Sequence, residues 1–239
     1  MKNTALFLTL ALIFPLSAFA EINPNEIVKK ADLKRGLGNV SHSFNVIITD
    51  QDHRIENYHV AFKDVNNSLT EQTEPERARG RKILMHEYDI WLFNPNIKKP
   101  LRISLEQKLT GQVSNGDIAR TNYAEDYEAK LLGIEKQNNI EVYHLDLKAK
   151  NNKVTYGKIE YIVAKKDFSP IEATFFALSG KPLKHANFSD FKPIQGMSRS
   201  TKMVIQDYLQ KDKFSTMIFT DHKTEKFSES YFNKERLEF

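Results

Sequence analysis

Residues 90–104 read I-W-L-F-N-P-N-I-K-K-P-L-R-I-S, and residues 111–127 read G-Q-V-S-N-G-D-I-A-R-T-N-Y-A-E-D-Y. The block begins as an apolar strand with the only tryptophan, Trp91, passes through a loop between Pro95 and Pro100, and returns as a second strand before the polar run. An apolar strand that leads into a polar segment indicates a sheet with an apolar face and a lid over it. We therefore expect the block to help bind an apolar ligand.

The first strand of this block is apolar on both sides. Trp91 and Phe93 share one face because side chains alternate along a strand, and Ile90 and Leu92 share the other face. Such a strand is expected to lie inside the sheet, with one side toward a cavity and the other side under a cover of its own.

The first twenty residues predict a cleaved signal peptide. Lys2 supplies the positive charge, residues 5–14 form the apolar stretch, and residues 18–20 read A-F-A just before Glu21. The apolar stretch is about half of the roughly 20 residues that a membrane span needs, and no later stretch is apolar enough. The chain has no cysteine, so it can have neither disulfides nor an acylated cysteine at the cleavage site. We expect export to a Gram-negative periplasm, without a membrane span in the mature chain.

Composition limits the function classes. A net charge of +4 is too small to be typical of nucleic-acid binding, so no nucleic-acid partner is expected. The chain is 40% hydrophobic and 28% charged, which is enough for a substantial core under a well-solvated surface. Neither a linker nor a repeat divides residues 21–239, and we expect one domain.

The secondary structure is predicted to be one helix followed by many strands. Asn23 can cap a helix that begins at Pro24 and runs to about Leu37, where glycines end it. Apolar residues then alternate with polar ones at 44–48 and 58–62, on either side of a turn at 50–52, which predicts a hairpin. Further strands are expected at 77–86, 89–94, 100–104, 127–135, 140–148, 156–164, 171–178, 182–191, 198–208 and 213–221.

These strands predict a mostly β fold built on a single curved, antiparallel sheet. A sheet with so many strands must curl, because strand twist accumulates across it. A chain with 16 Phe and 9 Tyr can line the inner face with large apolar side chains. Filling an ordinary core is the simpler role for each of them. The candidate cavity residues are Phe44, Val46, Ile48, Tyr58, Val60, Phe62, Trp91, Phe93, Tyr143, Leu145 and Phe175.

No catalytic, metal or cofactor motif stands out. The seven histidines include no H-E-x-x-H and no H-x-H pair, and there is no G-x-S-x-G. Asp50, Asp52 and His53 could gather around a metal ion, but their place between two strands favours a solvated turn. We expect no enzyme activity, no metal and no cofactor. An enzyme would instead require His59 or His144 beside a carboxylate in a cleft.

One basic feature could contact a lipid head group. Arg77, Arg79 and Arg81 alternate, so on a strand they would project from one face. A solvated sheet face or a protected edge is the alternative explanation.

Four segments resemble the outer-membrane lipoprotein-sorting protein family, and in particular its LolA-like branch. They are W-L-F-N-P-N-I-K-K-P-L-R-I-S at 91–104, G-Q-V-S-N-G-D-I-A-R-T-N-Y-A-E-D-Y-E-A-K-L-L-G at 111–133, S-P-I-E-A-T-F-F-A-L-S-G-K-P-L-K at 169–184 and Y-F-N-K-E-R-L at 231–237.

The resemblance implies a half-open β-barrel with a few helices as a lid over an apolar cavity. In the LolA-like family such a cavity receives acyl chains of lipoproteins, and a related protein uses the same fold to sense envelope stress. We match no residue of this chain to the arginine that gates loading in the sorting chaperone, so only the fold and the apolar ligand carry over.

The resulting functional hypothesis is a periplasmic carrier of lipid or lipoprotein acyl chains, delivering them to the outer membrane or to and from an exporter. Its expected partners are the acyl chains and either an inner-membrane exporter or an outer-membrane receptor. The lid would be the helix at 23–37 together with the segment 105–126. The alternative is a regulatory or interaction module on the same fold, without transported cargo.

Overall fold

Most of the chain folds around one large sheet in the computed structural model, which describes residues 22–36, 38–97, 99–120 and 122–237. The predicted signal peptide lies outside these residues. The 13 strands of the sheet follow the order β6-β5-β4-β3-β2-β1-β15-β14-β13-β12-β11-β10-β9, and all neighbours are antiparallel. Because β6 and β9 stay unpaired with each other, the barrel is half-open. The expected fold class is confirmed.

The strands of the sheet run through the whole chain. Their bounds are β1 His42–Asp50, β2 Ile55–Asp64, β3 Asn67–Glu74, β4 Lys82–His86, β5 Asp89–Phe93, β6 Leu101–Ile103, β9 Tyr127–Gln137, β10 Ile140–Ala149, β11 Lys158–Ala164, β12 Pro170–Phe176, β13 Pro182–Ile194, β14 Met197–Asp207 and β15 Phe214–Thr224. The register pairs Val46 with Tyr58 across β1 and β2, so the alternating apolar residues of both strands share the concave face. The predicted hairpin is confirmed.

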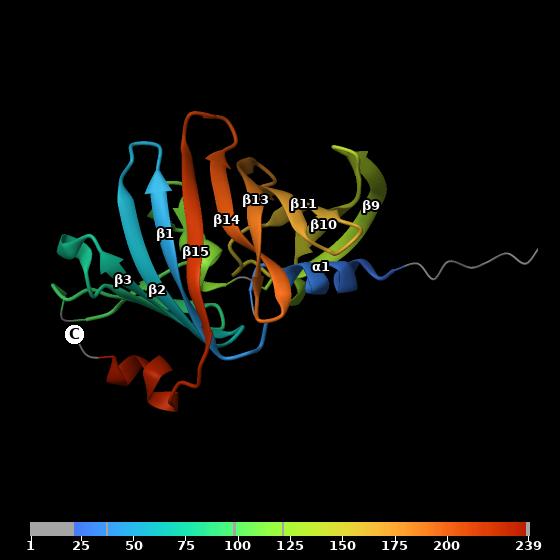
Figure 1. The fold of residues 1–239 in the computed structure, drawn as a ribbon. Coiled ribbons are helices and arrows are strands. Elements are labelled where there is room, and N and C mark those ends of the chain that lie inside the picture. The colour runs from blue at the N-terminus through green and yellow to red at the C-terminus, as the bar shows by residue number, and fades with distance from the viewer. Residues whose placement is uncertain (1–21, 37, 98, 121, 238–239) are drawn as a thin grey trace, which may run out of the picture.

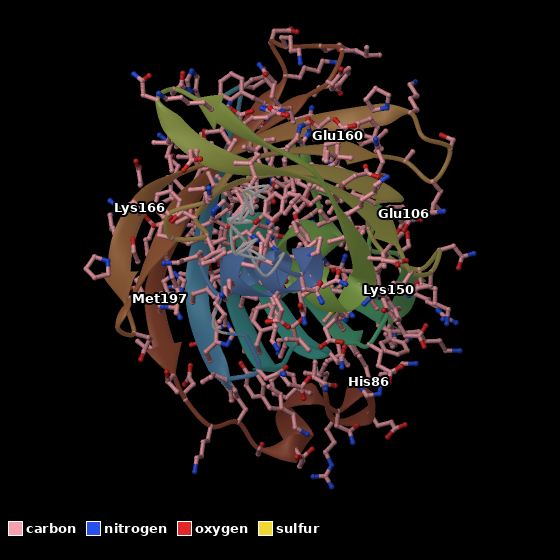
Figure 2. All side chains as sticks on the ribbon, turned by 90° about the vertical axis from the view of Figure 1, so that its right-hand side faces the viewer. His86, Glu106, Lys150, Glu160, Lys166 and Met197 are labelled. Carbon is pink, nitrogen blue, oxygen red and sulfur yellow. The ribbon has the colours of Figure 1, made fainter. Side chains whose placement is uncertain are left out.

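Helices and a small hairpin occupy the concave side. They are α1 Pro24–Asp32, α2 Asn115–Ala119 and α3 Tyr123–Asp126, with β7 Lys108–Thr110 paired to β8 Val113–Ser114. Short 3-10 turns lie at η1 Glu76–Ala78, η2 Glu229–Phe232 and η3 Lys234–Arg236. The strands curve around α1, as Figures 1 and 2 show from two directions. No helix within the described residues is long and apolar enough to span a bilayer.

Helix α1 begins as predicted but ends early. Asn23 caps it by accepting a hydrogen bond from the Asn25 amide at 2.9 Å, and Pro24 is its first residue. The helix stops at Asp32, five residues before the predicted end. Two residues of strand β14 bind the carbonyl groups just after the helix. The backbone amide of Ser200 donates to the Lys34 carbonyl, and the guanidinium of Arg199 donates to the Gly36 carbonyl. Tertiary contacts therefore end the helix before its glycines.

Two other predictions near the start of the sheet are wrong. Residues 77–81 were expected to begin a strand, but Pro75 leads into the η1 turn and Gly80 has a φ of +80°, so the extended chain resumes only at β4. Strand β3, with the polar sequence N-S-L-T-E-Q-T-E, was not predicted at all.

The convex face has its own cover. Leu69, Leu84 and Phe93 form a small cluster there, and the C-terminal segment 225–237 lies across it through Tyr231, Phe232 and Leu237. Figure 1 shows this segment in red, folded under the end of the sheet that carries β2 and β3.

Candidate functional site

The concave side divides into a packed interior and an open groove. The packed interior lies under α1 and holds nine of the candidate cavity residues: Phe44, Val46, Ile48, Tyr58, Val60, Phe62, Tyr143, Leu145 and Phe175. Ile27, Val28 and Ala31 of α1 close it from the open side, and all three are buried. A void of about 30 Å³ remains beside Phe44 and Phe188, and Phe62 also lines a pocket of about 300 Å³ between α1 and α3. Apart from Tyr58 and Phe62, which also line larger pockets, these side chains are used in packing against one another.

Trp91 and Phe93, the other two candidates, do not face this interior. They lie on the convex face in the cluster under the C-terminal segment, where the Lys234 ammonium stands 4.7 Å from the Trp91 ring. Their neighbours Ile90 and Leu92 face the concave side instead. Trp91 and Phe93 were therefore assigned to the wrong face. The sequence shows that they share a face, whereas the distant C-terminal segment determines which face it is.

The groove is a cavity of about 580 Å³ at the end of the sheet where strands β2 to β6 meet residues 107–115, which we call the covering segment. That volume lies within the range of roughly 300–1,000 Å³ that is typical of ligand pockets. Its apolar lining comes from Ile83, Leu92 and Ile103 on the sheet and from Leu109 on the covering segment. Tyr58 also lines it, and so joins the groove to the packed interior.

One wall of the groove is a hydrogen-bonded polar network centred on Glu56. Its carboxylate accepts bonds from the Tyr58 hydroxyl, from Gln72 Nε2 at 2.8 Å and from Thr110 Oγ1 at 3.1 Å. Burial raises the pKa of the Tyr58 phenol, and the bond to Glu56 raises it further, so Tyr58 remains a neutral donor. Because Thr110 belongs to β7, this network also holds the covering segment against the sheet.

The β7–β8 hairpin is docked closely on the sheet. Gly111 has a φ of +49°, and a Cβ atom there would lie 2.2 Å from Ser215 Oγ and 3.2 Å from Asp50 Cβ. The same Ser215 hydroxyl accepts the Gln112 amide at 2.9 Å. Position 111 therefore requires glycine, both for its backbone conformation and for the close approach. The hairpin is the part of the lid that closes over the groove.

Comparison with known proteins agrees with this architecture. The chain is 36% identical to a LolA superfamily protein from Nitrosomonas europaea, with a TM-score of 0.85 over 90% of this chain and 99% of that chain. The chain belongs to the LolA superfamily.

Two more distant structures share the fold of this LolA superfamily protein. One is a Vibrio parahaemolyticus domain whose name refers to outer membrane lipoprotein sorting, with 20% identity and a TM-score of 0.74 over 90% of this chain and 97% of that one. The other is a DUF1329 family protein from Desulfovibrio piger, with 20% identity and a TM-score of 0.74 over 91% of this chain and 100% of that one. A model of a family described only as an uncharacterized protein matches residues 64–239. No curated protein matches the chain.

The three arginines predicted to share a face are separated in this LolA superfamily fold. Arg77 is exposed in the η1 turn, and Arg79 forms ion pairs with Glu76 at 2.8 Å and Glu74 at 3.3 Å. Arg81 lines the groove. The shared strand face was a wrong prediction, because the η1 turn replaces the first part of that strand, and only Arg81 remains a candidate for head-group contact.

Two buried ion pairs, which sequence reasoning missed, fix the helices of the lid. Arg120 binds Asp126 through two hydrogen bonds of 2.6 Å and also reaches the carbonyls of Val65 and Glu87, so it ties the α2–α3 segment to two turns of the sheet. Asp32, at the end of α1, pairs with Arg35 and accepts the Ala124 amide at 2.8 Å. Burial raises the pKa of Asp32.

A third polar cluster places a lysine beside a serine, as some catalytic sites do, but it is buried away from solvent. Lys184 Nζ donates to Ser114 Oγ at 2.6 Å, and the Tyr156 hydroxyl donates to Asp117 at 2.7 Å. Burial lowers the pKa of Lys184. Ser114 is buried and caps α2 in a capping box with Asp117. The cluster therefore anchors the lid helix and leaves no room for a substrate at the serine.

The histidines offer no better catalytic site. His59 Nδ1 lies 2.9 Å from the Asn45 side chain, and His144 Nδ1 lies 2.9 Å from a carboxylate oxygen of the exposed Glu135. Neither histidine lines the groove. In the part of the chain that the structure describes, no group of three or more His, Asp or Glu side chains could hold a metal ion.

Proposed function

We propose that this LolA superfamily chain is a periplasmic carrier that binds acyl chains of a lipid or lipoprotein. In this proposal residues 1–20 are removed as a signal peptide, and residues 21–239 act as one lipid-binding domain that exchanges cargo with an exporter or with the outer membrane. The observation that supports this proposal is the groove of about 580 Å³, with apolar walls from both the sheet and the β7–β8 segment. No chemical step is part of the role, and the chain is proposed to act without enzyme activity or cofactor.

The groove supplies the affinity that such a carrier needs. Each buried methylene contributes about 0.8 kcal/mol, so a few methylenes over Ile83, Leu92 and Leu109 suffice for useful binding. Among the candidate residues, Tyr58 contacts the ligand directly in this proposal. The eight that fill the packed interior line the deeper part of the same concavity and meet cargo only when α1 moves. Release requires a state of lower affinity, which opening of the β7–β8 hairpin provides.

Lipid analysis and a titration test the proposal together. Mass spectrometry of the purified chain should find a co-purifying acyl lipid, and the delipidated chain should bind a fluorescent fatty acid. The Gly111→Val variant should lose the docked hairpin and release the probe several-fold faster, because the side chain collides with Ser215. Gly180→Val is the matched control, since Gly180 also has a positive φ but has nothing within 4 Å of an added Cβ. A delipidated chain that binds no acyl probe contradicts the proposal.

The second candidate is a regulatory or interaction module on the same fold. The filled interior favours it, because a void of about 30 Å³ beside Phe44 holds no acyl chain. Such a module would be recovered from periplasmic extracts with a stable protein partner and without lipid. The carrier would instead be recovered with lipid, so the same purification separates the two candidates.

A further inference from the structure

The mouth of the groove carries two cations from facing walls. Arg81 comes from the sheet, just before β4, and Lys108 comes from the covering segment, at the start of β7. Both side chains are exposed and both line the cavity. Neither forms an ion pair with any residue of the described ranges. They therefore place positive charge on opposite sides of one opening.

The surrounding carboxylates are already engaged elsewhere. Glu56 is the acidic residue of the groove lining, and its oxygens accept hydrogen bonds from Tyr58, Gln72 and Thr110. Glu74 and Glu76, which are close to Arg81 in sequence, form ion pairs with Arg79. The lining thus has one negative charge held in a network and two positive charges, of which Arg81 forms no ion pair within the described residues and Lys108 has only the longer-range attraction of Asp207.

A buried hydroxyl lies beside the same cavity. Thr70 is 2% exposed and lines the groove, and its Oγ1 atom has no hydrogen-bond partner. An unsatisfied buried polar atom costs free energy that a ligand oxygen would recover. Thr70 pairs with Ile83 across β3 and β4, and the next residue on that face of β3, Gln72, accepts a backbone bond from Gly80 and donates one to Arg81. The hydroxyl is thus set deeper than the cations, beside the apolar floor.

We infer that the groove selects an anionic amphiphile, in which the acyl chain lies over Ile83 and Leu92 and a carboxylate or phosphate head group lies between Arg81 and Lys108. This inference rests on the proposed acyl-binding function and adds the chemical class of the head group. The guanidinium of Arg81 can hold two oxygens at once, while Lys108 supplies a point charge from the lid. An anionic head group would therefore also draw the covering segment toward the sheet.

The test compares charged and neutral probes on the delipidated full-length mature chain. One pair is a fluorescent long-chain fatty acid and its methyl ester at pH 8, and the other is an alkyl phosphate and the alcohol of equal chain length. We expect at least one charged probe to bind about tenfold more tightly than its neutral partner, a preference that weakens as salt is added. The two pairs separate a carboxylate from a phosphate head group.

Paired variants locate the preference. In the double variant R81Q/K108Q the charged probe should lose most of the tenfold advantage, while the neutral probe keeps its affinity. The matched control R77Q/K166Q removes two exposed cations outside the groove and should change neither affinity. Circular dichroism verifies that both variants are folded.

The outcomes distinguish this inference from the proposed function beneath it. Equal binding of charged and neutral probes, or an unchanged preference in R81Q/K108Q, overturns the anionic head group and leaves acyl binding intact. Failure of all four probes to bind overturns the acyl-binding function itself, and the inference with it.

Discussion

The packed interior and the groove lie on the same face of the same sheet, yet they are built differently. Under α1 the concave residues are large and apolar, such as Phe44 and Phe175, and helix α1 fills the space between them. Toward β3 and β5 the concave residues become smaller or polar, such as Thr70 and Gln72, and only a short hairpin covers them. The difference indicates that one end stabilises the fold while the other leaves room for a ligand.

The largest expected effect tests the packed side of this comparison. Phe175 is 1% exposed and stacks on Tyr156 with ring centroids 4.3 Å apart. Phe175→Ala should lower the free energy of unfolding by about 3–5 kcal/mol, whereas Leu109→Ala in the groove should cost only about 1 kcal/mol. Urea denaturation followed by tryptophan fluorescence measures both. If Phe175→Ala were nearly neutral for stability but abolished acyl binding, Phe175 would belong to the ligand site.

Two adjacent residues of β5 sharpen the contrast between the faces. Trp91→Ala should lower the free energy of unfolding by about 1–3 kcal/mol, because the C-terminal segment loses its apolar contact with the Trp91 ring and the contact of Lys234 with that ring. Its acyl affinity should stay unchanged. Leu92→Ala should weaken acyl binding about fivefold, which corresponds to about 1 kcal/mol of lost burial. Thermal melts and probe titrations of both variants provide the measurement. Loss of acyl binding in Trp91→Ala would place the site on the convex face.

The elements with regular alternation could be predicted from the sequence. The hairpin of β1 and β2 and most later strands follow from period-two patterns, and the start of α1 follows from Asn23 and Pro24. In each case the local residues alone determine the structure. The end of α1 could not be predicted, because strand β14 bonds the carbonyls of Lys34 and Gly36 that follow the helix.

The groove was hidden from the sequence for a physical reason. Strand β3 reads as polar because Thr70 and Gln72 face the groove rather than a filled core, so the apolar alternation that marks a strand is absent. Strand β5 has the opposite property, since it is apolar on both faces and its orientation depends on the distant C-terminal segment. Residues that line the groove thus depart from the pattern that reveals secondary structure.

A smaller effect concerns the pH dependence of the packed end. The ring of His222 lies 5.3 Å from that of Phe44, and its pKa is lowered to about 4, mainly by burial and further by His42 and Arg199. The unfolded chain takes up this proton near pH 6.5, so the contribution to stability is complete above that pH and is lost as the pH falls toward 4. Partial exposure reduces the expected loss to about 1 kcal/mol at pH 5.

The His222→Phe variant tests this assignment. It should flatten the decline in the free energy of unfolding between pH 6.5 and 5, with a residual slope from His42, whose pKa burial also lowers. The exposed turn residue His53 serves as the control, and His53→Asn should leave the curve unchanged. Because no histidine lines the groove, the affinity for a neutral acyl probe should not follow the same curve. An unchanged slope in His222→Phe would contradict the assignment.

The smallest expected effect distinguishes a residue of the groove from a packing residue on the same strand. Thr70 Oγ1 has no partner, so Thr70→Val should leave the free energy of unfolding unchanged or raise it by up to about 1 kcal/mol. Ser68 stands two residues away on the same face and donates to the Ala119 carbonyl at 2.9 Å, so Ser68→Ala should lower stability by about 1 kcal/mol. Acyl affinity should change in Thr70→Val and stay the same in Ser68→Ala, because Thr70 lines the groove whereas Ser68 does not. Denaturation and probe titration of the two variants measure both effects. If Thr70→Val lost stability and kept its acyl affinity, the division of the concave face into a packed interior and a groove would be contradicted.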